Sequence, residues 1–390
     1  MLGQSAQTGR PVPWHVEEIV VKHRTRPGLA VLGTVLAALT GLLAAPAASA
    51  SPAPVSGATK HGDGQRLEFA VFGDFPYTPE QYANFPKVVD QFNADRGLDF
   101  VAHLGDIKSG STTCDDAYFA SIKAQFDRVN APLIYTVGDN EWTDCHRPNN
   151  GGYDPLERLA KVREVFFPNP GLTLGRHPMR VRSQDELGLP ENVSFERAGV
   201  AFAALHVVGS NNSLAPWTGK TAPTPQQTVE VLGRTAGVLQ EIHGAFARAR
   251  AERARAVVLF QQADMFDPTV ASPSFSDYFA FTPIVQAIAR ESARFRGQVY
   301  LFDGDSHVYN VDHPLAQNSS WLAFYSARPV TNLTRITVNG STNAVDYLRV
   351  TVNRNRGGDV LSWVRVPFAY LAPTGTARPA GALASAGAGR

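Results

Sequence analysis

Short apolar runs that end at a Gly-Asp pair are the main hydrophobic pattern of this chain. Four such runs occur, at residues 67–72, 100–104, 132–136 and 299–302. The aspartates that close them are Asp74, Asp106, Asp139 and Asp305. Apolar runs of this length, bounded by turn residues, predict buried strands. We therefore expect four strands that each deliver a carboxylate at the carboxyl end.

Amphipathic segments lie after the first three strands. Apolar residues recur at helical spacing in residues 79–95, 117–129 and 156–167. The first two of these helices alternate with strands, and strand–helix–strand order predicts a largely parallel sheet. In such sheets ligands bind at the carboxyl ends of the strands. The four aspartates are therefore expected to meet at one sheet edge.

The middle of the chain has a less regular pattern. Residues 172–192 combine proline, glycine and alternating charges, which we interpret as an insertion or lid loop. An antiparallel pair is expected at residues 193–196 and 200–208, turning at Ala198-Gly199. The polar loop 209–212 that follows is placed to reach the same site.

Regular elements return in the last third. Helices are predicted at residues 224–255 and 278–295, and a strand at residues 256–260. Four further strand-like runs, expected to complete a second sheet, are residues 321–326, 333–338, 344–352 and 361–366. Together these elements predict a mixed α/β (α+β) fold with a two-layer β-sheet core flanked by helices.

Four carboxylates at one sheet edge repel one another. Like charges a few ångströms apart in a partly dry site raise one another's pKa. A divalent metal ion is the simplest neutraliser of such a cluster. Any single Gly-Asp pair is a common turn, but the recurrence at four strand ends favours a metal site.

The order of these motifs resembles that of calcineurin-like metallophosphoesterases. That family has an Asp-x-x loop, then Gly-Asp, Gly-Asn-His-Glu and Gly-His-x-His. The corresponding segments here, within residues 66–311, are Gly73-Asp74-Phe75-Pro76, Gly105-Asp106, Gly138-Asp139-Asn140-Glu141 and Gly304-Asp305-Ser306-His307. The resemblance implies a four-layer α/β/β/α sandwich that hydrolyses a phosphomonoester or phosphodiester through a metal-activated water.

The resemblance also implies a set of metal ligands. Asp74 would bind one ion, Asp106 would bridge two ions, Asp139 stands where the family has asparagine, and His307 matches the last histidine. Two ions that share a bridging carboxylate stabilise both the attacking and the leaving oxygen.

Other positions would complete this site. Asp305 and one glutamine of the pair Gln261-Gln262, taken as Gln262, would add ligands, and Asn140 would contact the phosphate. His307 and Asn140 are thus the candidate catalytic residues. Asp264 is either a substitute ligand or the cap of a turn.

Four family histidines are replaced in this chain, by Pro76, Asn140, Gln261 or Gln262, and Asp305. The resulting oxygen-rich site favours Mn²⁺, Mg²⁺ or Ca²⁺ over Zn²⁺, as one ion or two. Loss of the usual proton donor at position 140 removes a contribution worth roughly 10²- to 10⁴-fold in rate. The alternative function is therefore a protein that binds a metal or a phosphorylated ligand without turnover.

The remaining histidines are interpreted conservatively. His103 and His206 lie within apolar strands, which is typical of core residues. His146 is the nearest replacement for the missing proton donor, although a loop histidine without a role is the simpler interpretation.

The amino-terminal segment indicates export. Arg24-Thr25-Arg26, an apolar run at residues 29–45 and Ala48-Ser49-Ala50 match a secretory signal peptide ending at residue 50, with a retained membrane anchor as the alternative. In an oxidising compartment Cys114 and Cys145 are expected to form a disulfide rather than to stay as free thiols. The signal peptide therefore predicts a secreted or extracytoplasmic protein.

The remaining boundaries follow from composition. Residues 51–65 are predicted to be a linker, residues 66–371 the phosphoesterase domain and residues 372–390 a disordered tail. Within 390 residues one such domain accounts for the motifs. The net charge of +1 gives no reason to expect nucleic acid or an anionic membrane as a partner. The resemblance implies a small-molecule phosphate ester as the substrate, and cleavage of the signal peptide would leave no stable membrane span.

Overall fold

The computed structural model describes residues 66–354 and 357–372. The chain divides into two units, Met1–Ala58 and Thr59–Arg390, and all described residues belong to the second. The expected signal peptide and linker, and the expected tail from residue 373 onward, lie outside the described residues.

The first sheet has the strand order β12-β11-β1-β2-β3. The strands β1 (Leu67–Phe72), β2 (Phe100–His103) and β3 (Leu133–Tyr135) are parallel, as predicted. The strands β11 (Asp346–Val352) and β12 (Leu361–Pro367) extend this sheet, with β11 antiparallel to β1 and β12 antiparallel to β11. Their assignment to the second sheet was wrong because hydrophobic alternation identifies a strand but not its partner.

The second sheet has the order β4-β5-β6-β7-β8-β10-β9. Its strands, in chain order, are β4 (Arg182–Gln184), β5 (Leu189–Arg197), β6 (Val200–Ala204), β7 (Ala256–Phe260), β8 (Gln298–Asp303), β9 (Asn310–Asp312) and β10 (Leu333–Thr337). The antiparallel pair β5–β6 is confirmed. The loop predicted at residues 172–192 is wrong in part, because it contains the short edge strand β4 and the start of β5.

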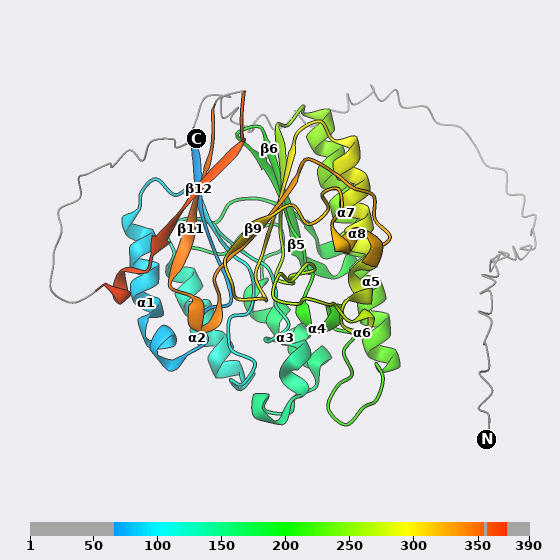
Figure 1. Cartoon of the computed structure of the whole chain (residues 1–390). Helices are drawn as coiled ribbons and strands as arrows, with labels where there is room; N and C mark the ends of the chain where they lie inside the picture. Colours follow the sequence, from blue (N-terminus) through cyan, green and yellow to red (C-terminus); the bar gives the residue numbers. More distant parts are fainter. Residues whose placement is uncertain (1–65, 355–356, 373–390) are drawn as a thin grey trace, which may run out of the picture. The chain divides into compact units, whose positions relative to one another are not determined.

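Helices cover the outer face of each sheet (Figure 1). The first sheet packs against α1 (Pro79–Ala94), α2 (Asp116–Arg128) and α3 (Pro155–Phe166), and the second against α5 (Pro225–Ala251), α7 (Thr282–Arg294) and α8 (Ser320–Phe324). Short helices are α4 (Gly209–Asn212) and α6 (Phe275–Tyr278). Single 3-10 turns occupy Thr143–His146, Pro148–Asn150, Asp185–Leu187, Phe279–Phe281, Ser341–Asn343 and Ala369–Leu371.

Helix starts follow ordinary capping chemistry. The Thr78 hydroxyl caps α1 by accepting from the Gln81 backbone N–H, and Thr224 caps α5 in the same way. None of the helices in the described ranges is both long enough and apolar enough to cross a membrane.

Residues 321–324 lie in the helix α8 and residues 325–326 in the turn that follows it, instead of in the strand that the sequence suggested. Trp321, Phe324 and Tyr325 stand three and four positions apart, which is helical spacing. The Trp321 and Tyr325 rings stack with centroids 5.6 Å apart, and Phe266 packs edge-on against both. A continuous apolar run is compatible with either element, and this packing contact decides for the helix.

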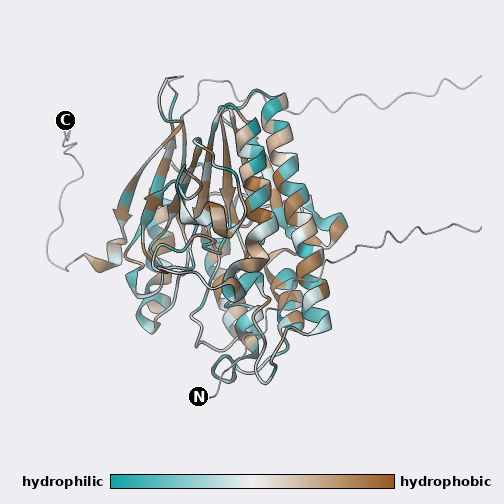
Figure 2. Ribbon diagram, turned by 45° about the vertical axis from the view of Figure 1, so that its right-hand side comes forward, coloured by the Kyte–Doolittle hydropathy of each residue, from teal (hydrophilic) through white to brown (hydrophobic). Residues whose placement is uncertain are grey.

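Aromatic rings fill the space between the two sheets. Phe69 of β1 stacks on Phe100 of β2, with ring centroids 4.6 Å apart. It also meets Phe202 and Phe260 of the second sheet edge-on, at 5.7 Å and 6.0 Å. In Figure 2 the strands are coloured mainly as hydrophobic, whereas the helices carry both hydrophobic and hydrophilic residues. The predicted two-layer sheet core flanked by helices, an α/β/β/α sandwich, is confirmed.

A disulfide joins Cys114 and Cys145, as predicted. It closes a loop with a sequence separation of 31 residues and links the segments that follow β2 and β3. Closure of a loop of this length stabilises a folded protein by roughly 3 to 4 kcal/mol in the chain-entropy treatment.

We expect the double variant Cys114→Ala/Cys145→Ala to show a lower melting temperature by calorimetry, because it lacks the disulfide. An unchanged melting temperature would show that the bridge adds no stability.

Candidate metal centre

The carboxyl ends of four strands converge on one cluster of acidic side chains. Asp74, Asp106 and Asp139 follow β1, β2 and β3, whereas Asp305 follows β8 of the facing sheet. The expectation of a single sheet edge is therefore corrected: two sheets contribute. The Asp305 backbone N–H donates to Asp74 Oδ1 at 3.1 Å and so joins the two edges.

Two overlapping groups of side chains have the spacing of metal ligands. Asp74, Asp106 and His307 form one, and Asp106, Asp139 and Asp305 form the other, with the potential ligand atoms of each group within 4.8 Å of one another. Asp106 belongs to both groups, as a bridging carboxylate would. Metal binding by these residues remains a prediction.

The backbone at this cluster adopts conformations that are unusual for residues with a side chain. The φ angles of Asp74, Asp106, Asp305 and His307 are 47°, 55°, 66° and 64°. Left-handed conformations cost non-glycine residues about 1 kcal/mol or more and persist at functional sites because the surrounding structure enforces them. Four of the five residues in the two ligand groups therefore have a left-handed backbone conformation.

The glycines of two Gly-Asp pairs make room for an aspartate from another strand. A Cβ at Gly138 would lie 2.2 Å from Asp106 Oδ1, and one at Gly304 would lie 2.1 Å from Asp74 Oδ2. Neither approach is possible for a real side chain. Glycine at these two positions therefore lets the aspartates meet.

Asp106 is the most heavily hydrogen-bonded of the four aspartates. Its Oδ1 accepts from the Asn140 backbone N–H at 3.1 Å, and its Oδ2 accepts from Asn140 Nδ2 at 2.7 Å and from Tyr77 Oη at 2.5 Å. Tyr77 Oη also lies 3.2 Å from His307 Nε2. Because Tyr77 Oη also accepts from Asn140 Nδ2 at 2.8 Å, the tyrosine hydroxyl lies between the two candidate catalytic residues, Asn140 and His307.

Glu141 organises the turn after β3. Its Oε1 accepts from the backbone N–H groups of Asp106 and Gly138 and from Tyr135 Oη. The side chain is fully buried. Glu141 therefore fixes the loop that carries Asp139 and Asn140.

Of the pair Gln261-Gln262, only Gln262, the glutamine expected at the site, reaches the cluster. Gln262 Nε2 donates to Asp139 Oδ1 at 3.3 Å, and its Oε1 accepts from the Gly209 N–H at 2.7 Å. Gln261 turns away and donates to the Ala263 carbonyl. The polar loop after β6 reaches the site as predicted, because Ser210 Oγ lies 2.9 Å from Asp139 Oδ2.

Three other residues that the sequence suggested, His103, His206 and Asp264, belong to neither ligand group. His103 Nε2 lies 2.8 Å from the Phe75 carbonyl, and burial lowers the pKa of His103 to about 4. His206 is buried beside Glu191. Both are core histidines, as predicted. Asp264 accepts from the Phe266 N–H and pairs with Arg335, which fits the cap interpretation, and its backbone N–H donates to Asp305 Oδ2 at 3.4 Å.

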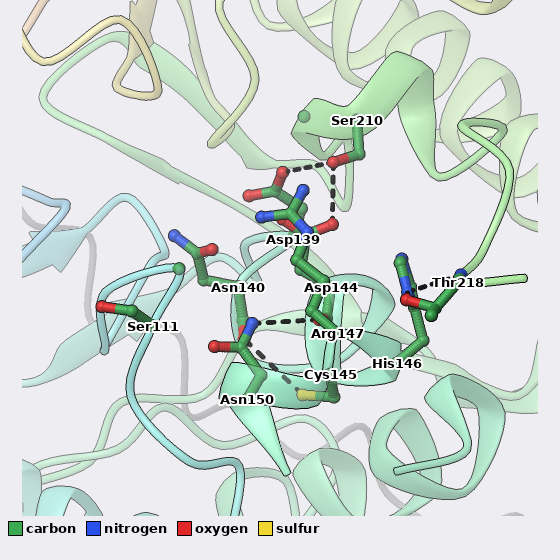
Figure 3. Close-up of polar contacts among 12 residues, drawn as sticks. Ser111, Asp139, Asn140, Asp144, Cys145, His146, Arg147, Asn150, Ser210 and Thr218 are labelled. Carbon is green, nitrogen blue, oxygen red and sulfur yellow. Dashed lines mark hydrogen bonds and ion pairs between the residues drawn. The ribbon is translucent and has the colours of Figure 1, made fainter. Parts of the chain in front are cut away.

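His146 faces away from the cluster. Its Nδ1 accepts from the Thr218 backbone N–H at 2.9 Å, and Figure 3 shows the ring turned toward Thr218. Burial and the neighbouring Arg147 lower the pKa of His146 to about 4. The interpretation as a loop histidine fits this geometry better than a proton donor does.

Two polar residues at the site carried no signal that the sequence analysis used. Tyr77 follows Asp74-Phe75-Pro76 directly, so its position in the first loop was the available clue. Lys108 follows Asp106 by two residues, and its Nζ donates to the Asn140 carbonyl at 2.8 Å inside the protein. Burial lowers the pKa of Lys108 to about 8.

The charge balance of the cluster favours a cation. Burial, and then the charge of Asp139, raises the pKa values of Asp106 and Asp305 well above the usual range. Among the described residues, the one ion-pair partner of the four clustered aspartates is His307, 3.2 Å from Asp74. Buried carboxylates without basic partners are ionised when they bind a metal. The donor set therefore fits a divalent ion.

A pH dependence of stability follows from these pKa values. Burial raises the pKa of both Glu141 and Asp144 to about 7, in the same direction as Asp106 and Asp305. The folded metal-free protein thus binds more protons than the unfolded chain between about pH 4 and pH 7, and its stability falls as pH rises through this window. We expect its melting temperature to be at least about 5 °C lower at pH 8 than at pH 5.

The same measurement with added Mn²⁺ provides the control. A bound cation takes the place of the protons on the carboxylates, so the difference in melting temperature between pH 5 and pH 8 should become smaller. Equal pH dependence with and without Mn²⁺ would contradict a metal at this cluster.

No model of a protein family matches the sequence, and no curated protein matches it. Several solved structures are similar in fold. GAP50, the anchor in the inner membrane complex of Plasmodium, has 11% identity and a TM-score of 0.42, covering 78% of this chain and 89% of that one. The purple acid phosphatase PPD1 from yellow lupin (Lupinus luteus) has 11% identity and a TM-score of 0.41, covering 74% and 49%. A 5'-nucleotidase precursor from Thermus thermophilus has 8% identity and a TM-score of 0.39, covering 77% and 54%.

Proposed function

We propose that this protein is an exported, metal-dependent phosphoesterase that hydrolyses a phosphomonoester or phosphodiester. The observation that carries the proposal is the pair of ligand groups that share Asp106 at the meeting point of two sheets. The catalytic domain would comprise residues 66–371. The Cys114–Cys145 disulfide supports export, because such bridges persist in oxidising compartments.

Asp74, Asp106 and His307 would hold one ion, and Asp106, Asp139 and Asp305 a second. A bound divalent ion polarises phosphoryl oxygens and lowers the pKa of water. The carboxylate-rich donor set suits Mn²⁺, Mg²⁺ or Ca²⁺ better than Zn²⁺.

The surrounding residues position these ligands. Gln262 holds Asp139, and Asn140 together with Tyr77 holds Asp106. Burial lowers the pKa of His307, but the hydrogen bond and charge of Asp74 outweigh it and raise the pKa above its usual value. A metal ion held by Asp74, Asp106 and His307 would displace this proton, so His307 would hold the ion in its neutral form.

A cavity of about 540 Å³ adjoins the cluster and offers room for the leaving group. Asp305 and Ser210 border it on the metal side, and Tyr278, Asp267 and Asp277 also line it. Its lining combines polar residues with apolar ones such as Pro216, Val270 and Phe281, so the cavity does not by itself select the leaving group.

The second candidate is a protein that binds a metal or phosphorylated ligand without turnover. The observation in its favour is that His146 faces Thr218 and so does not stand in for the proton donor missing at position 140. The two candidates share the metal and differ in turnover.

Metal content and turnover of the purified protein test the proposal. We expect bound divalent metal by elemental analysis, and hydrolysis of p-nitrophenyl phosphate or bis-p-nitrophenyl phosphate with Mn²⁺ that stops after chelation and returns when Mn²⁺ is restored. The control variant Asp127→Asn, which removes an exposed carboxylate of α2, should behave like the wild type. Metal without turnover would leave the binding function, and absence of both would refute the proposal.

A further inference from the structure

Arg147 is a basic side chain at the rim of the aspartate cluster. It is 42% exposed, and its Nη2 pairs with Asp144 Oδ2 at 2.7 Å. Asp144 Oδ1 lies 2.9 Å from Ser210 Oγ, which also lies 2.9 Å from Asp139 Oδ2 (Figure 3). A continuous series of polar contacts therefore holds the guanidinium near the candidate ligands.

Gly110 lies close to this guanidinium, and we call the small space at its missing side chain the notch. A Cβ at Gly110 would lie 3.0 Å from Asn140 Oδ1 and 3.4 Å from Arg147 Nη1. The two atoms thus border the same small space. Asn140 connects that space to the cluster, because the Nδ2 end of its amide lies 2.7 Å from Asp106 Oδ2.

The available hydrogen-bond donor in this notch comes from Arg147. Asn140 Nδ2 already donates to Asp106 Oδ2 and to Tyr77 Oη. The end of the Asn140 amide that faces the notch is Oδ1, an acceptor that repels phosphate oxygens, so the expected contact of Asn140 with the phosphate does not fit this geometry. Arg147 Nη1 presents N–H groups to the same space, and a guanidinium binds phosphate oxygens through its planar set of donors.

We propose that Arg147 binds the non-bridging phosphate oxygens of the substrate and makes the site selective for phosphomonoesters over phosphodiesters. A phosphomonoester carries about −1.5 to −2 charges at neutral pH and three terminal oxygens. A diester carries a single charge and two such oxygens, so it gains less from the guanidinium. This inference rests on the phosphoesterase function proposed above.

The test compares Arg147→Gln and Gly110→Ala with the wild type, all as the Mn²⁺-loaded full chain. Arg147→Gln removes the charge. Gly110→Ala places a methyl group in the notch, against Asn140 Oδ1 and Arg147 Nη1, and removes neither member of the Arg147–Asp144 pair. We expect each variant to bind inorganic phosphate at least about 10-fold more weakly by calorimetry, the size of one lost charged hydrogen bond. The metal content should not change.

Turnover provides the selectivity readout. For Arg147→Gln, kcat/KM should fall about 10- to 100-fold for p-nitrophenyl phosphate and less than about 3-fold for bis-p-nitrophenyl phosphate. Arg128→Gln is the matched control, because Arg128 is 38% exposed and pairs with Asp90 at 2.7 Å. It should leave phosphate affinity and both rates unchanged.

Several outcomes separate this inference from the function on which it rests. Wild-type phosphate affinity in Arg147→Gln, or an equal loss for both esters, overturns the role of Arg147 while the phosphoesterase stands. If Arg147→Gln does not fold, Gly110→Ala decides, and unchanged phosphate affinity there overturns the inference. A wild-type protein with neither metal nor turnover refutes the proposed function instead.

Discussion

Asp106→Asn is expected to lose bound metal and to lower any phosphoesterase turnover by roughly 10³-fold or more, because Asp106 alone belongs to both ligand groups. The substitution keeps the shape of the side chain but removes its charge. Elemental analysis and p-nitrophenyl phosphate hydrolysis with Mn²⁺ measure the two effects.

The same variant should be more stable than the wild type when both are free of metal. Burial and the charges of Asp139, Glu141, Asp74 and Asp305 all raise the pKa of Asp106, so its ionised form is disfavoured. A neutral amide relieves this repulsion, and we expect the metal-free melting temperature to rise by about 2 to 5 °C. Added Mn²⁺ should stabilise the wild type and not the variant.

Asp303→Asn is the matched control for Asp106→Asn. Asp303 is a fully buried aspartate on β8 whose Oδ1 accepts from Thr337 Oγ1, and it belongs to neither ligand group. The Asp303→Asn variant should keep its bound metal. If Asp303→Asn loses as much metal as Asp106→Asn, then loss of any buried aspartate of this region impairs metal binding. That result would contradict a bridging role for Asp106.

Arg335→Met is expected to destabilise the fold by about 3 to 5 kcal/mol, the usual cost of removing one partner of a buried ion pair. Arg335 is fully buried and contacts the carboxylates of Asp264 and Asp312 and the Phe266 carbonyl. Methionine fills similar volume but leaves Asp264 buried without a basic partner. Thermal or urea unfolding should show a melting temperature lower by about 5 to 15 °C.

A double variant separates charge from packing in this prediction. Arg335→Met/Asp264→Asn removes both members of the buried pair, so it should recover much of the stability lost by Arg335→Met alone. If the double variant is as unstable as the single one, lost packing and not the unpaired carboxylate accounts for the effect.

The sequence by itself determined the local features of this protein. Apolar runs predicted β1, β2, β3, β7 and β8 at nearly their observed positions, and helical spacing predicted α1, α2, α3 and α5. The Gly-Asp endings identified Asp74, Asp106, Asp139 and Asp305, and the motif order added His307. These predictions succeed because side-chain periodicity and turn residues are encoded within about 20 consecutive residues.

The tertiary structure decided which distant segments meet. Asp305 comes from the facing sheet and contacts Asp74 across 231 residues of sequence, and β11 joins the first sheet rather than the second. Tyr77 and Arg147 reach the site through loop conformations that no periodicity records. A strand's pattern fixes which side chains are buried, whereas its partner depends on packing between the two sheets, because many pairings bury the same residues equally well.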